Sequence, residues 1–226
     1  FLDRGHFAPL ISAVTDAARA ADPQAAAGCV VDLGAGPGAY LAAVLDTLPD
    51  RAGVALDVSK YAMRRAARAH PRIGAAVCDI WWQVPVRAGA AALVLNVFAP
   101  RNGDEIARIL RPDGSLLVAT PTPDHLAEIV APLGLLTVDA GKAERVEREL
   151  APRLHLVDRS HVAFTMALRP ADVVAVAAMG PSAWHVDADE VARRIRDVGD
   201  LLHVTASITL TRYRARRPAP AARAPA

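Results

Sequence analysis

A glycine-rich turn between an apolar strand and a helix constrains the fold more than any other feature of this chain. Residues 30–33 are apolar except for Asp32, and Gly34-Ala35-Gly36-Pro37-Gly38 follows. Glycine lets the backbone turn tightly and approach a ligand closely, and the first N–H groups of the next helix have no partner within it. The sequence therefore predicts a strand–loop–helix unit that holds a nucleoside-containing ligand. A glycine loop without a ligand is the alternative.

Short β-branched runs alternate with amphipathic stretches along the chain. The predicted strands are Cys29–Leu33, Val54–Asp57, Ile73–Cys78, Ala92–Asn96, Ser115–Thr120, His161–Leu168 and Val204–Tyr213. The predicted helices are Phe7–Ala20, Ala39–Thr47, Tyr61–Ala69, Asp104–Leu110, Pro123–Ala131, Ala171–Met179 and Ala188–Val198. This alternation is typical of an α/β fold with a mostly parallel, seven-stranded sheet and helices on both faces. The last strand alternates apolar and polar residues, which favours an antiparallel strand near the edge.

Composition excludes several classes of protein. The chain has 226 residues, of which 53% are hydrophobic and 22% charged, so it can bury a full core and is not intrinsically disordered. No apolar run could span a bilayer, and the first residues do not resemble a signal peptide. We expect a cytoplasmic protein with no membrane partner. The two cysteines, Cys29 and Cys78, have no metal-ligand spacing, so we predict no metal site.

The basic charge is concentrated at the C-terminal end. Residues 212–226 hold five arginines and no acidic residue, whereas residues 1–211 hold 21 basic and 24 acidic residues. We predict a folded domain over 1–211, with substrate-side elements at about 121–200, and a disordered basic tail over 212–226.

Acidic residues beside the glycine loop indicate which cofactor binds there. Asp57 follows Gly34 by 23 residues at the end of the next strand, where a carboxylate can accept hydrogen bonds from ribose hydroxyls. Asp32 would repel a phosphate but suits a cation such as the sulfonium of S-adenosylmethionine. We therefore favour S-adenosylmethionine over NAD. Asp79, after the third strand, either accepts the adenine amino group or caps a helix.

Several further blocks carry a resemblance to a known family. They are Phe1–Phe7, Leu56–Lys60, Asn96–Arg101, Leu110–Gly114, Thr120-Pro121 with Asp124–Leu126, and Met179–His185. With the glycine loop, they resemble the class I S-adenosylmethionine-dependent methyltransferases, and more narrowly the large-subunit rRNA (guanine-N1)-methyltransferases of the RlmA type. The blocks at Asn96 and Met179 look most like the Gram-positive branch, which includes the tylosin-resistance methyltransferase.

The resemblance implies a Rossmann-like class I methyltransferase fold and a reaction. The reaction is methyl transfer to N1 of one guanine in a 23S rRNA hairpin near the macrolide site, with macrolide resistance as an expected consequence. It also implies cofactor contacts from Phe7, Tyr40, Leu41 and His125. Together with the residues above, the expected cofactor-binding set is Phe7, Asp32, Gly34, Gly36, Gly38, Tyr40, Leu41, Asp57, Asp79, Asn96 and His125. Relatives carry an N-terminal zinc module ahead of the first block, so we expect zinc only if such a module precedes this chain.

Candidate groups for binding the target base lie after the fourth strand. The Asn96 amide can donate to guanine O6, and Phe98 can stack on the base; a helix cap and a core side chain are the alternatives. Trp184 can stack, and His185 can contact the base or a phosphate, unless both anchor a loop. His6, His125 and His185 can titrate near neutrality, and none is favoured as the general base.

A basic helix face is the best candidate for an RNA contact. Lys60, Arg64, Arg68 and Arg72 recur every four residues, with Arg65 beside them. A solvated surface helix is the alternative reading. A methyltransferase acting on a small metabolite, a noncatalytic RNA-binding protein and an NAD-linked oxidoreductase remain competing functions, and a homodimer remains open.

Overall fold

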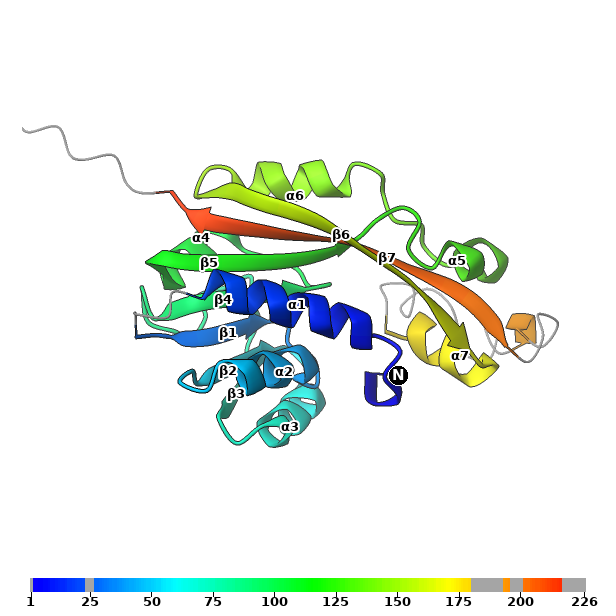
Figure 1. Ribbon diagram of the computed structural model, residues 1–226, viewed down its shortest axis with the longest axis horizontal. Coiled ribbons are helices and arrows are strands. Elements are labelled where there is room, and N and C mark those ends of the chain that lie inside the picture. Colours follow the sequence, from blue (N-terminus) through cyan, green and yellow to red (C-terminus); the bar gives the residue numbers. More distant parts are fainter. Residues whose placement is uncertain (1, 23–26, 180–192, 196–200, 217–226) are drawn as a thin grey trace, which may run out of the picture.

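Seven strands form one sheet in the order β3-β2-β1-β4-β5-β7-β6 (Figure 1). The strands are β1 (Cys29–Leu33), β2 (Gly53–Asp57), β3 (Ile73–Val77), β4 (Ala91–Val97), β5 (Leu110–Pro121), β6 (Leu154–Leu168) and β7 (Leu202–Ala215). The helices are η1 (Leu2–Arg4), α1 (Ala8–Ala21), α2 (Ala39–Thr47), α3 (Lys60–Ala69), α4 (Gly103–Ile109), α5 (Ala127–Leu133), α6 (Lys142–Leu150) and α7 (Pro170–Ala177). The computed structural model describes residues 2–22, 27–179, 193–195 and 201–216.

The sheet is parallel from β3 to β5 and antiparallel beyond it. β1, β2, β3, β4 and β5 pair in parallel, whereas β7 runs antiparallel to both β5 and β6. The predicted mostly parallel sheet with an antiparallel last strand is confirmed. β7 is not an edge strand, because β6 covers its outer side. Strand order reverses between β1 and β4, and ligands in open α/β sheets bind beyond the carboxyl ends of the strands at such a point.

Helices cover both faces of the sheet, as predicted. One face packs against α1, α2 and α3, and the core there includes Leu10, Val14, Leu41 and Leu45. The other packs against α4 and α6 through Ile106, Ile109, Val146 and Leu150. Each such side chain contributes about 1.5–3 kcal/mol when it is fully buried. Among the described residues, no helix is both long enough and apolar enough to cross a membrane.

The part of the chain after β5 differs most from the prediction. α5 begins at Ala127 and not at Pro123, because the backbone N–H groups of Thr122 and Leu126 bond to carbonyls of β7 and Leu126 has a positive φ of 58°. α6 was not predicted, and β6 begins seven residues before the predicted His161. The predicted helix Ala188–Val198 lies outside the described residues except for 193–195, which are helical.

The predicted boundary between domain and tail is wrong. β7 continues to Ala215, and Arg212 lies within it, with its guanidinium 2.6 Å from a carboxylate oxygen of Asp158 on β6. The pairing partners β5 and β6 continue alongside these residues, so the sheet keeps them ordered. Residues 217–226 of the predicted tail lie outside the described part of the chain.

Candidate functional site

The glycine loop adopts a backbone conformation that other residues rarely take. Gly34, Gly36 and Gly38 have φ values of 74°, 51° and 85°. A Cβ atom on Gly34 would lie 2.4 Å from the Cβ atom of Ala99, in the loop after β4. The Gly34 N–H donates to the Leu56 carbonyl at 2.8 Å, which fixes the loop against β2. The predicted strand–loop–helix unit is present, and α2 follows directly after Gly38.

Asp57, at the end of the neighbouring strand β2, binds the backbone of the glycine loop. Its Oδ2 accepts a hydrogen bond from the Gly36 N–H at 3.0 Å, and its Oδ1 accepts one from the Ser59 N–H at 2.8 Å. Each carboxylate oxygen retains a further lone pair for a ligand. The carboxylate is therefore held at the end of β2, where the sequence predicted a ribose contact.

Asp32 is a buried carboxylate without a counterpart. It is 1% exposed, and neither side-chain oxygen has a hydrogen-bond partner among the described residues. Burial, and secondly the charge of Asp57, raises the pKa of Asp32 to about 7. No described residue bonds to the buried Tyr40 hydroxyl either, and burial and the charge of Asp32 raise the pKa of Tyr40. An unpaired buried carboxylate is costly, so this site suits a ligand that brings positive charge and donors.

These residues fit S-adenosylmethionine. The sulfonium and amino groups match the orphaned Asp32 carboxylate, and the glycines leave room for close approach of a nucleoside. The Leu41 side chain does not face this ligand, because it is fully buried in the core close to Gly53. Its predicted contact can only come from its backbone N–H in the first turn of α2.

Asp79 organises the loop after β3. Its Oδ1 accepts a hydrogen bond from the Trp81 N–H at 3.0 Å, so it caps this turn and not a helix. Asp79 is exposed, and it retains acceptor capacity for an adenine amino group.

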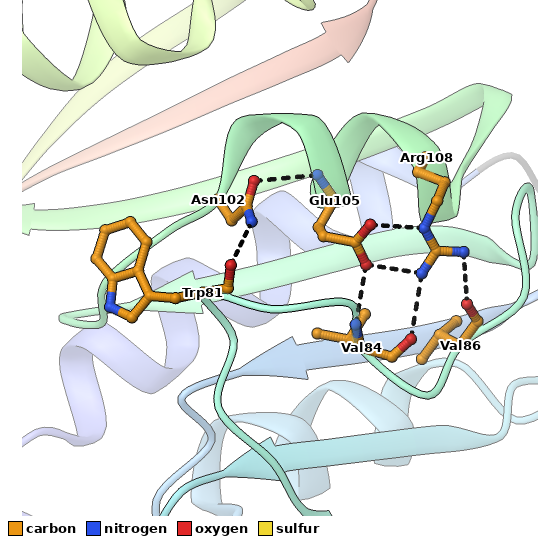
Figure 2. Close-up of polar contacts among 6 residues, drawn as sticks. All are labelled: Trp81, Val84, Val86, Asn102, Glu105 and Arg108. Carbon is orange, nitrogen blue, oxygen red and sulfur yellow. Dashed lines mark hydrogen bonds and ion pairs between the residues drawn. The ribbon is translucent and has the colours of Figure 1, made fainter.

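The rest of this loop is fastened to α4, as Figure 2 shows. Asn102 donates to the Trp81 carbonyl at 3.0 Å, and Glu105 accepts from the Val84 N–H at 2.9 Å. Arg108 binds Glu105 through two 2.7 Å contacts, and it also donates to the carbonyls of Val84 and Val86. The arrangement fixes the loop while Trp81 stays 60% exposed.

Asn96 has a different role from the predicted one. It is fully buried, and its amide nitrogen donates to the carbonyls of Leu33 at 3.3 Å and Pro100 at 2.7 Å. Its amide oxygen accepts from Arg101 Nε at 3.2 Å. Both N–H bonds are therefore used within the protein, and the predicted donation to guanine O6 does not fit these contacts. Asn96 instead ties the loop after β4 to the end of β1.

Phe98 projects from that loop into an aromatic cluster. It has a positive φ of 54° and is 39% exposed. Its ring centroid lies 6.0 Å from that of Phe7 and 5.6 Å from that of His125. Phe7 stacks nearly parallel to His125, with centroids 6.3 Å apart. Three predicted site residues from distant parts of the sequence are thus brought together.

The N-terminal segment is anchored beside this cluster. Arg4 and His6 both contact the buried Asp172 at the start of α7, with His6 Nε2 3.3 Å from Asp172 Oδ1. His6 therefore positions the segment that carries Phe7. In Figure 1, α5, α7 and the N-terminal segment all lie at the end of the sheet where β4 and β5 terminate.

A cavity of about 400 Å³ opens next to the cluster, within the range of small-molecule binding sites. Its lining comes from the Phe98 loop, the segment before α5, the α5–α6 connection and α7. The aromatic and ionisable side chains in the lining are Phe7, Phe98, His125, Asp139, Lys142 and Arg145. Sequence reasoning missed the last three, although Lys142 is one of only two lysines in the chain.

His125 is held as a neutral side chain. Its Nδ1 accepts a hydrogen bond from the Ser207 N–H at 3.1 Å, which assigns the ring proton to Nε2. Burial, with the charge of Lys142 as a smaller cause, lowers the pKa of His125 to about 4. His125 can therefore donate a hydrogen bond into the cavity from Nε2 near neutral pH.

The basic face of α3 loses one predicted member. Lys60, Arg64, Arg65 and Arg68 are exposed. Arg72 instead donates to the carbonyls of Leu48 at 2.7 Å and Pro49 at 2.8 Å, and to those of Leu45 and Arg51. Arg72 stabilises the turn after α2, so it does not extend the stripe. Trp184 and His185 lie outside the described residues.

Comparisons with known proteins place the chain in a family. No protein-family model matches it. It is 51% identical over 210 residues to the 23S rRNA (guanine(748)-N(1))-methyltransferase of Streptomyces fradiae, a match that covers 93% of this chain and 75% of that protein. The chain belongs to the 23S rRNA (guanine-N1)-methyltransferase family. A Micromonospora griseorubida protein whose name assigns it to the same 23S rRNA methyltransferases is 47% identical over 226 residues, covering 95% and 77% of the two chains.

The fold of this chain is similar to those of solved methyltransferase structures. The crystal structure of a methyltransferase from Geobacter sulfurreducens, in complex with S-adenosyl-L-homocysteine, has a TM-score of 0.55 and 14% identity. The match covers 91% of this chain and 90% of that one. The predicted Rossmann-like class I methyltransferase fold and family resemblance are both confirmed.

Proposed function

We propose that this protein transfers the methyl group of S-adenosylmethionine to N1 of a guanine in 23S rRNA. The observation that carries this proposal is the 51% identity, over nearly the whole chain, to a 23S rRNA (guanine(748)-N(1))-methyltransferase. The finer proposal is that the guanine lies in the hairpin bordering the macrolide site, that its methylation confers resistance to tylosin-type macrolides, and that the enzyme acts in the cytoplasm.

The cofactor would lie across the carboxyl ends of β1 and β2. Asp32 would pair with its positively charged end, Asp57 would accept from the ribose, and Asp79 would accept from the adenine amino group. The N–H groups of Tyr40 and Leu41, at the start of α2, would donate to the same ligand. Bound there, S-adenosylmethionine supplies an electrophilic methyl group. Asp32 would then be held ionised by the charge beside it.

The target guanine would enter the cavity beside Phe98. A base in a hairpin must leave its stack to present N1 to a methyl group, at a cost of a few kcal/mol. Stacking on an aromatic side chain returns about 1–3 kcal/mol, and the half-exposed Phe98 ring is available for it. The Nε2–H of His125 would donate to O6, which gains charge when N1 loses its proton. His125 thus takes the role that the sequence suggested for Asn96.

RNA outside the pocket would contact the basic face of α3. Lys60, Arg64, Arg65 and Arg68 would bind phosphates, which makes the affinity for RNA dependent on salt. Replacing the three arginines with alanine should weaken RNA binding and leave cofactor affinity unchanged. Equal RNA affinity of the triple variant and the wild type across a salt series would contradict this assignment.

The decisive assay uses labelled S-adenosylmethionine and the 23S rRNA hairpin, with nucleoside mass spectrometry to locate the methyl group. We expect N1-methylguanosine with the wild type and a large loss with Asp32→Asn. Absence of RNA labelling, with cofactor binding retained, would favour a small-metabolite substrate. Expression in a tylosin-sensitive host, with Asp32→Asn as control, tests the resistance proposal.

A further inference from the structure

Methylation at guanine N1 requires a group that removes the N1 proton, because N1 is protonated at neutral pH. The ionisable side chains among the described residues that line the cavity are His125, Asp139, Lys142 and Arg145. A base must be unprotonated, free of competing hydrogen bonds and within reach of the substrate. Three of the four groups do not meet these conditions.

His125 is unsuited because its only unprotonated nitrogen, Nδ1, accepts the Ser207 N–H. Asp139 has both carboxylate oxygens engaged, with Oδ2 2.6 Å from Arg145 Nη1 and Oδ1 2.8 Å from the Gly141 N–H. These contacts hold the pKa of Asp139 below its usual range. Arg145 retains its proton at any physiological pH.

Lys142 remains, and its surroundings disfavour its protonated form. It is the first residue of α6, where the helix dipole is unfavourable to a cation. The side chain is half-buried, and its amine makes no hydrogen bond or ion pair with any residue that the structure describes. Burial, then the guanidinium groups of Arg101 and Arg145, lower its pKa, whereas the charge of Asp139 opposes them. The charge of Lys142 is also a smaller cause of the lowered pKa of His125, which lines the same cavity.

We propose that Lys142, in its neutral form, is the general base that takes the N1 proton of the target guanine. The inference rests on the proposed function. The N1 proton passes to Lys142 Nζ, and the N1 electron pair forms the new bond to the methyl carbon. The carbon–sulfur bond breaks and its electrons remain on sulfur. His125 stabilises the charge on O6 through Nε2–H, and the Lys142 ammonium later returns its proton to water.

Substitutions that separate charge from basicity test this role. Lys142→Arg keeps the positive charge but cannot accept a proton, and Lys142→Met removes both. We expect kcat to fall about 10²-fold or more in both variants, as general-base catalysis is worth 10²–10⁴, with RNA and cofactor affinities within twofold of wild type. Arg148→Met on the exposed side of the same helix is the matched control. Near-normal kcat in Lys142→Arg would overturn the proposal, as would near-normal kcat in Lys142→Met.

The pH profile gives a second readout. Wild-type kcat should rise with pH through the pKa of Lys142, and this limb should disappear in Lys142→Arg. Added small primary amines should restore part of the activity of Lys142→Ala. A rising limb retained in Lys142→Arg would assign the titrating group elsewhere and overturn the proposal.

The pKa of Lys142 can also be measured without any substrate. The chain has only two lysines, Lys60 and Lys142, so reductive ¹³C-methylation should give two readily assigned side-chain NMR signals. The Lys142 signal should titrate below the ordinary lysine pKa of 10.5, and titration at or above that value would overturn the proposal. This measurement, and the wild-type RNA assay, distinguish failure of the base assignment from failure of the proposed function. If the wild type does not methylate guanine N1, the function itself is wrong.

Discussion

The unpaired carboxylate of Asp32 predicts a trade-off between stability and cofactor binding. Without the cofactor, Asp32 is buried and has no hydrogen-bond partner in the described part of the chain, and its pKa is about 7, against an ordinary value of 3.8. The substitution Asp32→Asn keeps the size of the side chain and removes its charge. We expect this variant to be more stable than the wild type above neutral pH and to bind S-adenosylmethionine poorly.

The size of the effect follows from the pKa difference of about three. At 1.36 kcal/mol for each pKa unit, ionising Asp32 in the folded protein costs about 4 kcal/mol of stability. A raised pKa means that the stability is fully present below about pH 4 and is lost as pH rises to about 7. The asparagine variant lacks this titration. Its advantage over the wild type should therefore be near zero at pH 4 and grow to several kcal/mol at pH 8.

Denaturant unfolding at both pH values measures the stability, and titration calorimetry measures the binding. Cofactor affinity should fall about 10²-fold or more in Asp32→Asn, because an ionic contact is lost. Binding to the wild type should release a proton near pH 7, which is seen as a dependence of the heat on the buffer. Asp50→Asn, an exposed carboxylate after α2, is the matched control.

Two results would refute this reasoning. One is a stability difference between Asp32→Asn and wild type that stays constant from pH 4 to pH 8. The other is wild-type cofactor affinity in Asp32→Asn, which would mean that Asp32 does not face the positive charge of the ligand.

Three further predictions concern the fold around the site. Gly34→Ala should lower the free energy of unfolding by more than about 2 kcal/mol, because the added Cβ meets Ala99. The control Gly89→Ala also has a positive φ (64°), but its added Cβ has no atom within 4 Å, so it should lower the free energy of unfolding by only about 1 kcal/mol. Equal losses in denaturant unfolding would contradict the predicted clash. Burial lowers the pKa of His125 from 6.5 to about 4. Its contribution to stability should therefore be full above pH 6.5 and fall by up to about 3 kcal/mol toward pH 4. Thermal unfolding across pH should show this loss in the wild type and a flatter profile in His125→Asn. Arg72→Met should destabilise the protein by about 2–4 kcal/mol, because the Arg72 guanidinium binds backbone carbonyls. The RNA affinity of the folded variant should equal that of the wild type. A selective loss of RNA affinity in filter binding would refute this structural role for Arg72.

Much of the cofactor side follows from local sequence. β1 and α2 occur at the predicted residues, and Gly34, Gly36 and Gly38 take the left-handed conformations for which glycine is suited. The spacing of Asp32 and Asp57 relative to those glycines placed both carboxylates at the carboxyl ends of adjacent parallel strands. Short-range geometry decides these features, because a strand, a tight turn and a helix restrict where the intervening side chains lie.

The substrate side was decided by tertiary structure. The hydrogen bonds that occupy Asn96 come from β1 and the Phe98 loop, and those that occupy Arg72 come from the turn after α2. Lys142 reaches the cavity only because α6 lies near His125, and no sequence period reports such an approach. Likewise, β7 pairs with β5 on one side and β6 on the other, which extends it past the expected tail boundary. Local sequence specified a nucleoside-binding loop. Contacts between distant segments determined which side chains remain available to the substrate. The reason is that a polar group can bind a ligand only when it does not already form hydrogen bonds within the folded chain.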